Sequence, residues 1–359
     1  MSFDIKYQDI AIQIEKKIKS KKYHDFLPGQ KVLINEFKVS QRTISKAVAC
    51  LKEKKIIEFQ KGIGNKIISG KAGAAFAKNL KIACFMDIKT GDYYSNKKKL
   101  KYINGLIRGC IDFGSYIILI DNNDRKSLFQ KLLEIKKRKD IDAVIYQGLH
   151  YNDKKTINIL KSFKKPVLLT QHFYGDAFSV VFYNNQEIIK KIFSHAPKNK
   201  NTYLISFRVT EPESWCWIEE REVFFKKYFG ARGEIIKTEK IINIDKFYYG
   251  EIVQSGYDTM KAYIQDIKFP AVIIAINSLI CKGVMKYCIE HNISIPGKAD
   301  IVTIDNEKII TRDLITTIDI SSYRLGFFAM KTIHEKFDEI KSGKIINEII
   351  PCKIIRGVT

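Results

Sequence analysis

The segment from Pro270 to Asn306 limits the possible folds of this 359-residue chain more than any other segment. Residues Ala271 to Ile276 form an apolar run rich in β-branched residues, which predicts a strand buried on both faces. Ser278 is expected to cap the helix that follows, and Asp300 to Ile304 predict a second strand. Strand, helix and strand in this order predict a βαβ unit, which requires a parallel sheet with a right-handed crossover.

Two polar side chains directly follow these predicted strands, Asn277 after the first and Asp305 after the second. The carboxyl ends of parallel strands lie at one edge of a sheet, where open α/β folds bind ligands, so both side chains are candidates for ligand contact. The alternative is that Asn277 only caps the helix and Asp305 only forms a strand-end turn. The residues alone leave both alternatives open.

The same segment resembles the effector-sensing domain of the LacI family of bacterial repressors. That family has an apolar strand, Asn-Asp, a helix, a turn that contains proline, and a strand that closes on Gly-Phe-Asp-Asp. This chain has Ser278, Thr303 and Asn306 where the family has the first Asp, the Gly and the last Asp. The tail from Leu314 to Thr359 agrees as well, and the resemblance covers roughly residues 80 to 359.

Apolar and amphipathic segments alternate from Lys81 onward, which predicts the α/β class for the whole domain. We predict two lobes, each a doubly wound parallel sheet, and the resemblance implies a fold like that of type I periplasmic binding proteins. Ser179 to Tyr183 are expected to pair into the second sheet, and the helix from Tyr323 to Ile340 to return to the first lobe. The predicted boundaries are about residues 81–175 and 306–341 for lobe 1, and about residues 176–305 and 342–359 for lobe 2.

A smaller module is predicted in front of this domain. Amphipathic spacing indicates helices at Tyr7 to Ser20, at Val32 to Phe37, and from the N-cap Ser40 to Lys55. Short strands at Ile56 to Phe59 and Lys66 to Ile68 complete a winged helix-turn-helix. The predicted domains are residues 1–70 for this module, 71–80 for a weakly patterned linker, and 81–359 for the two-lobed domain.

The module resembles the DNA-binding domain of the GntR family. That family reads Leu-Pro-Ser-Glu-Arg, then Phe-Gly-Val-Ser-Arg-x-Thr-Val, then a Gly-x-Gly wing, and this chain has Leu27 to Lys31, Phe37 to Ile44 and Gly62 to Gly64 at these places. The family commonly has Arg at several positions where this chain differs, so its operator sequence does not carry over. Winged helices also mediate protein contacts, which is the alternative. The predicted DNA-binding residues are Lys31, Gln41, Arg42, Thr43, Ser45, Lys46, Lys61, Gly62 and Gly64.

Charge is consistent with this assignment without deciding it. The chain has a net charge of +23, of which residues 1–71 carry +9 and the remaining 288 residues carry +14. The denser charge at the front suggests a polyanion partner. Lysine is abundant throughout, however, so a surface solvated by lysine is the alternative.

The resemblance to the LacI family implies further ligand contacts. An Arg in the family pattern Arg-x-x-Gly-Phe pairs with ligand hydroxyls or carboxylates, and Arg221 to Phe225 matches it with Phe224 in place of Gly. A surface Arg in a charged helix is the alternative. Aromatic rings at strand-end loops can stack on a sugar face, and Trp215 and Trp217 belong to this group, although such rings are more often core residues. The predicted ligand-binding residues are Arg221, Asn277, Asp305, Gln171, Tyr93, Tyr94 and Phe182.

The sequence contains no G-x-S-x-G, H-E-x-x-H or P-loop motif, so we expect no catalysis, no cofactor and no metal site. Seven scattered cysteines without a C-x-x-C pair suit a reducing compartment. The first ten residues lack an apolar signal segment, so we expect a cytoplasmic protein that does not associate with membranes.

These features together predict a ligand-responsive bacterial transcriptional regulator of the repressor type. Its expected partners are double-stranded operator DNA, a monosaccharide effector and a second copy of the chain. A sugar-binding transport receptor and an α/β enzyme that acts on a sugar are the alternatives. The sequence names neither the effector nor the operator, nor whether the effector releases or strengthens DNA binding.

Overall fold

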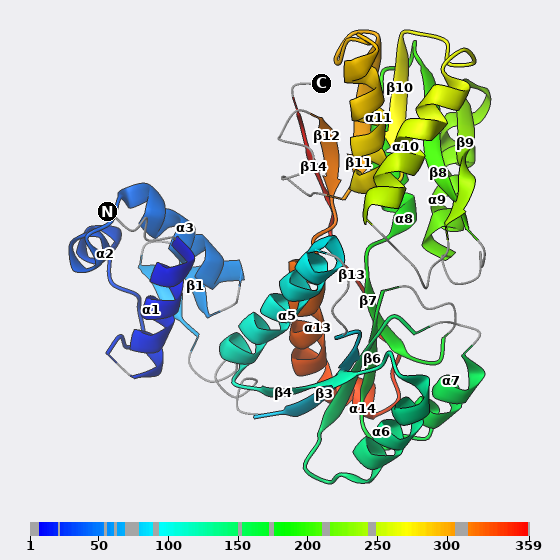
Figure 1. The fold of residues 1–359 in the computed structure, drawn as a ribbon. Coiled ribbons are helices and arrows are strands. Elements are labelled where there is room, and N and C mark those ends of the chain that lie inside the picture. The colour runs from blue at the N-terminus through cyan, green and yellow to red at the C-terminus, as the bar shows by residue number, and fades with distance from the viewer. Residues whose placement is uncertain are drawn as a thin grey trace. The chain divides into compact units, whose positions relative to one another are not determined.

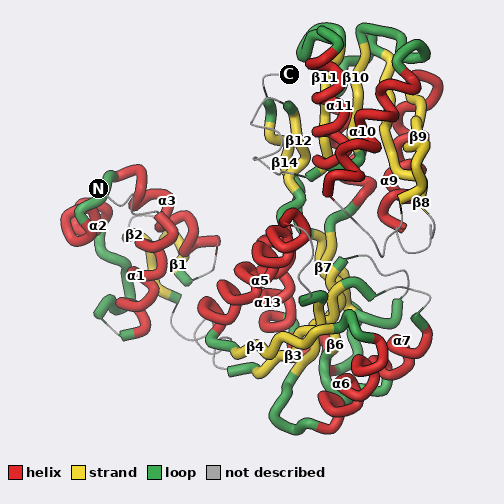
Figure 2. Tube along the Cα trace, viewed as in Figure 1, coloured by secondary structure: helices red, strands yellow, loops and turns green. Residues whose placement is uncertain are grey.

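A computed structural model describes residues 7–20, 22–53, 56–60, 63–68, 79–88, 93–149, 153–171, 176–209, 216–242, 249–305 and 315–357. The chain divides into two compact units, Met1–Asn79 and Leu80–Thr359 (Figures 1 and 2). Most of the expected linker, residues 71–80, lies outside the described ranges.

Among its described residues, the first unit contains three helices followed by an antiparallel pair of strands (Figure 2). Apolar residues at helical spacing on the third helix, including Ile44 and Leu51, are buried in one core with Ile14 of the first helix. The expected N-cap is confirmed, because Ser40 Oγ accepts a hydrogen bond from the Thr43 backbone N–H at 3.2 Å. The elements are α1 (Tyr7–Lys19), α2 (Gln30–Phe37), α3 (Gln41–Glu53), β1 (Ile57–Gln60) and β2 (Gly64–Ile67).

The second unit has two lobes, each built on a six-stranded sheet. The first sheet is parallel throughout, with the order β13-β7-β6-β5-β3-β4. Its strands are β3 (Lys81–Met86), β4 (Tyr116–Asp121), β5 (Ala143–Gln147), β6 (Val167–Thr170), β7 (Ser179–Phe182) and β13 (Asn347–Ile349). The described helices of this lobe are α5 (Tyr93–Phe113), α6 (Arg125–Lys137), α7 (Lys154–Lys161), α13 (Ser322–Glu335) and α14 (Phe337–Lys341).

The second sheet has the order β14-β12-β11-β10-β8-β9, and only β14 pairs in the antiparallel direction. Its strands are β8 (Asn201–Val209), β9 (Gly233–Ile242), β10 (Ala271–Ala275), β11 (Ala299–Ile304), β12 (Thr316–Asp319) and β14 (Lys353–Ile355). The described helical elements of this lobe are α8 (Asn185–His195), α9 (Cys216–Phe229), η2 (Gly230–Arg232), α10 (Tyr249–Tyr263) and α11 (Ser278–Glu290).

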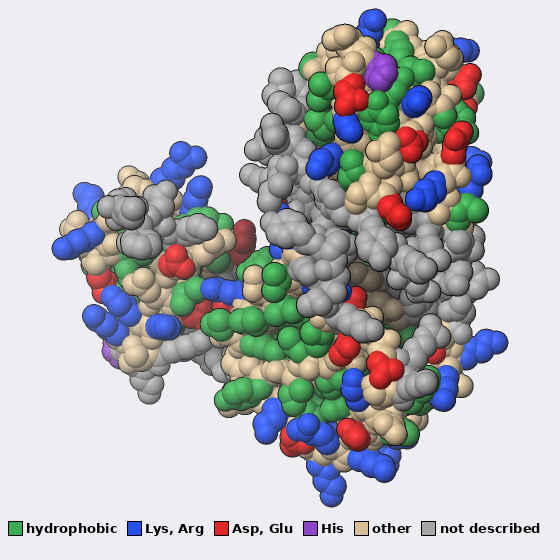
Figure 3. Space-filling view, in the orientation of Figure 1, with side chains coloured by type: hydrophobic (Ala, Val, Ile, Leu, Met, Phe, Trp, Pro, Cys, Tyr) green, Lys and Arg blue, Asp and Glu red, His purple; other side chains and the backbone are tan. Residues whose placement is uncertain are grey.

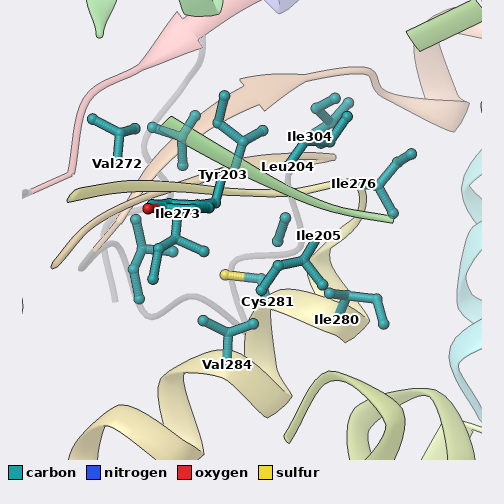
Figure 4. Close-up of a cluster of buried hydrophobic side chains, with 14 of the residues drawn as sticks. Tyr203, Leu204, Ile205, Val272, Ile273, Ile276, Ile280, Cys281, Val284 and Ile304 are labelled. Atoms are coloured by element: carbon teal, nitrogen blue, oxygen red, sulfur yellow. The ribbon is translucent and has the colours of Figure 1, made fainter. Parts of the chain in front are cut away.

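The predicted βαβ segment, from Ala271 to Ile304, forms the centre of the second lobe. All five residues of β10 are buried, and the strand lies between β8 and β11. Figure 4 shows Leu204, Ile273 and Ile304 of these strands in one cluster with Cys281 and Val284 of α11. The predicted α/β class and the predicted βαβ unit are therefore confirmed.

Three strands belong to a different sheet from the one that the sequence suggested. One is β13, which pairs with β7 in the first sheet, although residues 342–359 were assigned to lobe 2. Ser179 to Phe182 form β7, which pairs with β6 in the first sheet and not with the second sheet. Thr316 to Asp319 form β12, which pairs with β11 in the second sheet, although residues 306–341 were assigned to lobe 1. Short apolar strands such as these carry no sequence signal for the sheet that they join, because either sheet can bury them. The return of the tail helix is confirmed, since α13 packs against α5.

Glycines let a pair of helices approach closely in each lobe. A Cβ added at Gly105 of α5 would lie 2.0 Å from the carbonyl oxygen of Tyr323, on α13. In the second lobe, a Cβ added at Gly283 of α11 would lie 2.0 Å from the carbonyl oxygen of Val253, on α10. No larger residue fits at either place without moving a helix.

Candidate functional site

Arg221 is the central residue of the predicted ligand site in the second lobe. Helix α9 supplies it, and its side chain is buried, with 6% of the residue exposed. Its Nε donates a hydrogen bond to Asn185 Oδ1 at 3.0 Å, and its Nη1 donates to the Ile276 carbonyl oxygen at 3.1 Å. The guanidinium carbon also lies 4.4 Å from the centre of the Trp217 ring. These contacts fix the guanidinium group at the carboxyl end of β10, so it is not a surface Arg.

Asn277 is the N-cap of α11, a role that was expected of Ser278. Its Oδ1 accepts hydrogen bonds from the backbone N–H groups of Leu279 at 3.0 Å and Ile280 at 2.9 Å. Ser278 is instead the first residue of the helix. The amide oxygen is thus used structurally, and the Nδ2 group is the part of this side chain that the predicted ligand role requires.

Asp305 follows β11 directly and has a φ of 98°, which places its backbone in the left-handed region. Its N–H donates to the Ile318 carbonyl oxygen at 2.9 Å, and its own carbonyl oxygen accepts from Thr317 Oγ1 at 3.2 Å. Strand β12 therefore fixes the main chain of Asp305. Asp305 Oδ2 also forms an ion pair with Lys98 Nζ.

The structure brings Arg221, Asn277 and Asp305 together from three separate segments. Arg221 bonds to the residue that precedes Asn277, and the charge of the Asp305 carboxylate acts on its guanidinium. Burial lowers the pKa of Arg221 to about 10, while the charges of Asp305 and Glu220 oppose that shift. A buried cation beside a carboxylate can donate to and accept from the hydroxyl groups of a polar ligand.

The candidate ligand-binding residues of the first lobe lie on different elements. Gln171 is exposed just after β6, with a φ of 75°. Phe182 is half-buried on β7, in the first sheet. Tyr93 and Tyr94 were expected in a loop, but they form the first turn of α5, because that helix begins earlier than its apolar spacing indicates. The fourth aromatic candidate, Trp215, lies outside the described residues.

Lys98 and Asn185 also contact candidate site residues, and neither was predicted from the sequence. Lys98 belongs to the lysine-rich first turns of α5, and Asn185 is the first residue of α8, after the crossover from β7. Asn185 donates to Glu220 Oε2 at 2.6 Å as well as accepting from Arg221. Asn185 lies shortly after the end of β7, which is the signal that could have found it, whereas Lys98 lies within α5, away from any strand end.

In the first unit, α3 exposes Gln41, Arg42, Ser45 and Lys46 on the side opposite its buried residues. Thr43 is half-buried and contacts Ser40 Oγ, and Lys31 is exposed on α2. Gly64 opens β2 with a φ of 128°, a conformation that side chains rarely adopt. Lys61 and Gly62 lie outside the described residues.

No helix among the described residues is long and apolar enough to cross a membrane. Within the same residues, no group of three or more His, Cys, Asp and Glu side chains is placed to hold a metal ion.

No family model matches the sequence, and no curated protein matches it. Solved structures do match. The LacI family transcriptional regulator CcpA from Weissella paramesenteroides, solved with bound sucrose, gives a TM-score of 0.58 at 17% identity, over 77% of this chain and 97% of that chain. The trehalose repressor from Escherichia coli gives 0.55 at 14% identity, over 77% and 100%.

A LacI family transcriptional regulator from Enterococcus faecalis, solved with bound ribose, gives a TM-score of 0.57 at 16% identity, over 77% of this chain and 97% of that chain. Likeness at such low identity shows the fold. The predicted two-lobed fold, like that of periplasmic binding proteins, is therefore confirmed for this chain.

Proposed function

We propose that this chain is a transcriptional regulator whose second unit senses a monosaccharide and whose first unit binds operator DNA. The observation that carries the proposal is the buried group of Arg221, Asn277 and Asp305 at the carboxyl edge of the second sheet. This group lies within a fold that the chain shares with regulators solved with bound sucrose or ribose.

The chemistry of the group suits a polyol. Asp305 accepts hydrogen bonds, whereas Arg221 and the Asn277 amide donate them, so neighbouring hydroxyl groups can satisfy both kinds of partner. Trp217 holds the guanidinium of Arg221 against its ring, which gives this aromatic residue a positioning role. A site with buried polar groups discriminates strongly, because a ligand that lacks a hydroxyl leaves one of them unpaired.

DNA binding is proposed for the first unit as a GntR-type winged helix-turn-helix. Helix α3 follows α2 after a short turn and presents an exposed row of Gln41, Arg42, Ser45 and Lys46. An exposed polar face on a second helix is the arrangement with which such units read the major groove. Side chains of this kind donate to base edges and phosphates.

A homodimer is proposed through the first lobe. Helix α5 leaves Leu100, Ile107 and Ile111 exposed at 58%, 45% and 69%, and Tyr323 of α13 is 39% exposed. Figure 3 shows a continuous hydrophobic area over these two helices. Exposed apolar areas of this kind mark association surfaces. A dimer of winged helices matches an operator with two half-sites.

The proposed mechanism couples the two units through the sensor. A ligand that contacts both lobes favours their closed arrangement, which alters the dimer surface on α5 and α13 and thereby the spacing of the DNA-binding units. Any ligand that binds only the folded chain also raises its thermal stability, by about 2.7 kcal/mol at 100 times its Kd.

Two assays test the proposal. Genomic DNA fragments retained by the purified chain should share a near-palindromic sequence, and a thermal-shift screen of monosaccharides, sugar acids and purines should identify a stabilising monosaccharide. Stabilisation by a monosaccharide without any DNA retention would support a transport receptor instead. Turnover of that monosaccharide during incubation would support an enzyme.

A further inference from the structure

Lys98 connects the two lobes at the candidate site. It lies on α5 in the first lobe, whereas its ion-pair partner Asp305 follows β11 of the second sheet. The Asp305 side chain is 7% exposed and the Lys98 side chain 35% exposed. The neighbouring Lys99 differs, since it pairs with Asp87 at 2.6 Å within the first lobe. Lys98 is therefore a charged group of one lobe that neutralises a buried carboxylate of the other.

Both partners are held by rigid parts of their own lobes. The main chain of Asp305 is fixed to β12 by hydrogen bonds with Ile318 and Thr317. Helix α5 is 21 residues long and packs closely on α13 through Gly105. Because neither partner can follow the other without its lobe, separating the lobes separates the charges.

We propose that Lys98 and Asp305 form a clasp that favours the closed arrangement of the two lobes, and that Lys98 thereby sets the ligand affinity of the site. Ligand and clasp then stabilise the same arrangement. The proposal rests on the proposed function only where it concerns ligand and DNA.

Closure can be measured in the full chain without ligand or DNA. Spin labels on unnatural amino acids at the exposed positions Lys136 and Ile289, one in each lobe, report the distance between the lobes by electron resonance. Lys98→Met keeps the length of the side chain and removes its charge, so it should shift the distance distribution toward more open lobes. Lys99→Met, which removes an ion pair within one lobe, should leave the distribution unchanged.

A double variant tests whether the effect belongs to the pair. Asp305→Asn retains a residue type that tolerates positive φ and should open the lobes as Lys98→Met does. Combining the two should open them no further than either alone, because both remove one interaction. Unchanged distances in Lys98→Met would overturn the clasp, whatever the chain is found to bind.

The monosaccharide from the thermal-shift screen supplies a second readout. Loss of the clasp lowers the closed population, so the ligand Kd of Lys98→Met should rise about two- to fivefold, as expected for a partly exposed ion pair. Operator affinity without ligand should move in the direction opposite to the ligand's own effect. Tighter ligand binding by Lys98→Met would contradict the proposal, since it would mean that Lys98 competes with the ligand for Asp305.

Discussion

At the scale of single residues, Asn277 shows why one side chain can satisfy two interpretations. Its Oδ1 caps α11, as the structural alternative required, and its Nδ2 belongs to the other end of the same amide. Capping and ligand binding can therefore be separated by substitution. Serine also caps helices well but carries no amide donor.

Asn277→Ala should lower the free energy of unfolding by about 1 kcal/mol, because the cap is lost. Asn277→Ser should retain most of that stability, and both variants should lower ligand affinity by about five- to 150-fold, which corresponds to one unpaired buried group. Urea denaturation and calorimetric titration measure the two effects. Full ligand affinity in the Ser variant would assign Asn277 to the cap alone.

Arg221 and Asp305 call for different substitutions. Asp305 has a φ of 98°, so Asp305→Asn avoids the strain that Ala would add. Arg221→Lys keeps the charge but cannot reach Asn185 and the Ile276 carbonyl with one planar group. Each variant should weaken ligand binding about five- to 150-fold. Operator affinity without ligand should stay near wild type in Arg221→Lys. Wild-type ligand affinity in both the Arg221 and the Asp305 variant would show that the ligand binds elsewhere.

At the scale of elements, α3 is the helix proposed to contact DNA. Arg42→Ala and Lys46→Ala should each weaken operator binding. Loss of a base contact should cost about 1–3 kcal/mol and relax the sequence specificity, whereas loss of a phosphate contact should weaken binding equally for all sequences. Lys16→Ala removes one charge from the exposed face of α1 and is the control. Fluorescence anisotropy over a salt series measures these effects. Unchanged operator affinity in both α3 variants would show that this helix does not bind in the major groove of DNA.

Close packing of α5 on α13 gives a second prediction at this scale. Gly105→Ala would place a methyl group 2.0 Å from the Tyr323 carbonyl oxygen and should destabilise the chain by about 1–3 kcal/mol. Gly250→Ala, in α10, meets nothing within 4 Å and should stabilise that helix by up to about 1 kcal/mol. Chemical denaturation distinguishes the two signs, and equal stability in both variants would contradict the close approach of the helices.

Some helices, strands and site residues could be predicted from the sequence, and others could not. The long periodic helices and the buried β10 carry strong local patterns, so their type was predictable. The sheet that β7 or β12 joins depends on distant partners, and the first turn of α5 begins with residues that lack apolar spacing. Asn277 and Asp305 could be predicted from strand ends, whereas Lys98 could not, because its partner lies 207 positions away in the chain.

At the scale of the whole molecule, the two compact units predict separable functions. A fragment that begins at Leu80 should fold and bind the monosaccharide with the affinity of the full chain, because the described core of the second unit is complete within it. Circular dichroism and calorimetric titration check this. An insoluble fragment from a chain that folds when complete would show that the boundary is wrong.

Sugar binding in the second unit is proposed to change DNA binding by the first. The most direct measurement is the operator affinity of the full chain by fluorescence anisotropy, with and without a saturating concentration of the monosaccharide. We expect operator affinity to change by about five- to 150-fold, and ligand affinity to change by the same factor when operator is saturating, because coupling between two sites is reciprocal. Operator affinity that stays the same at saturating ligand would contradict it.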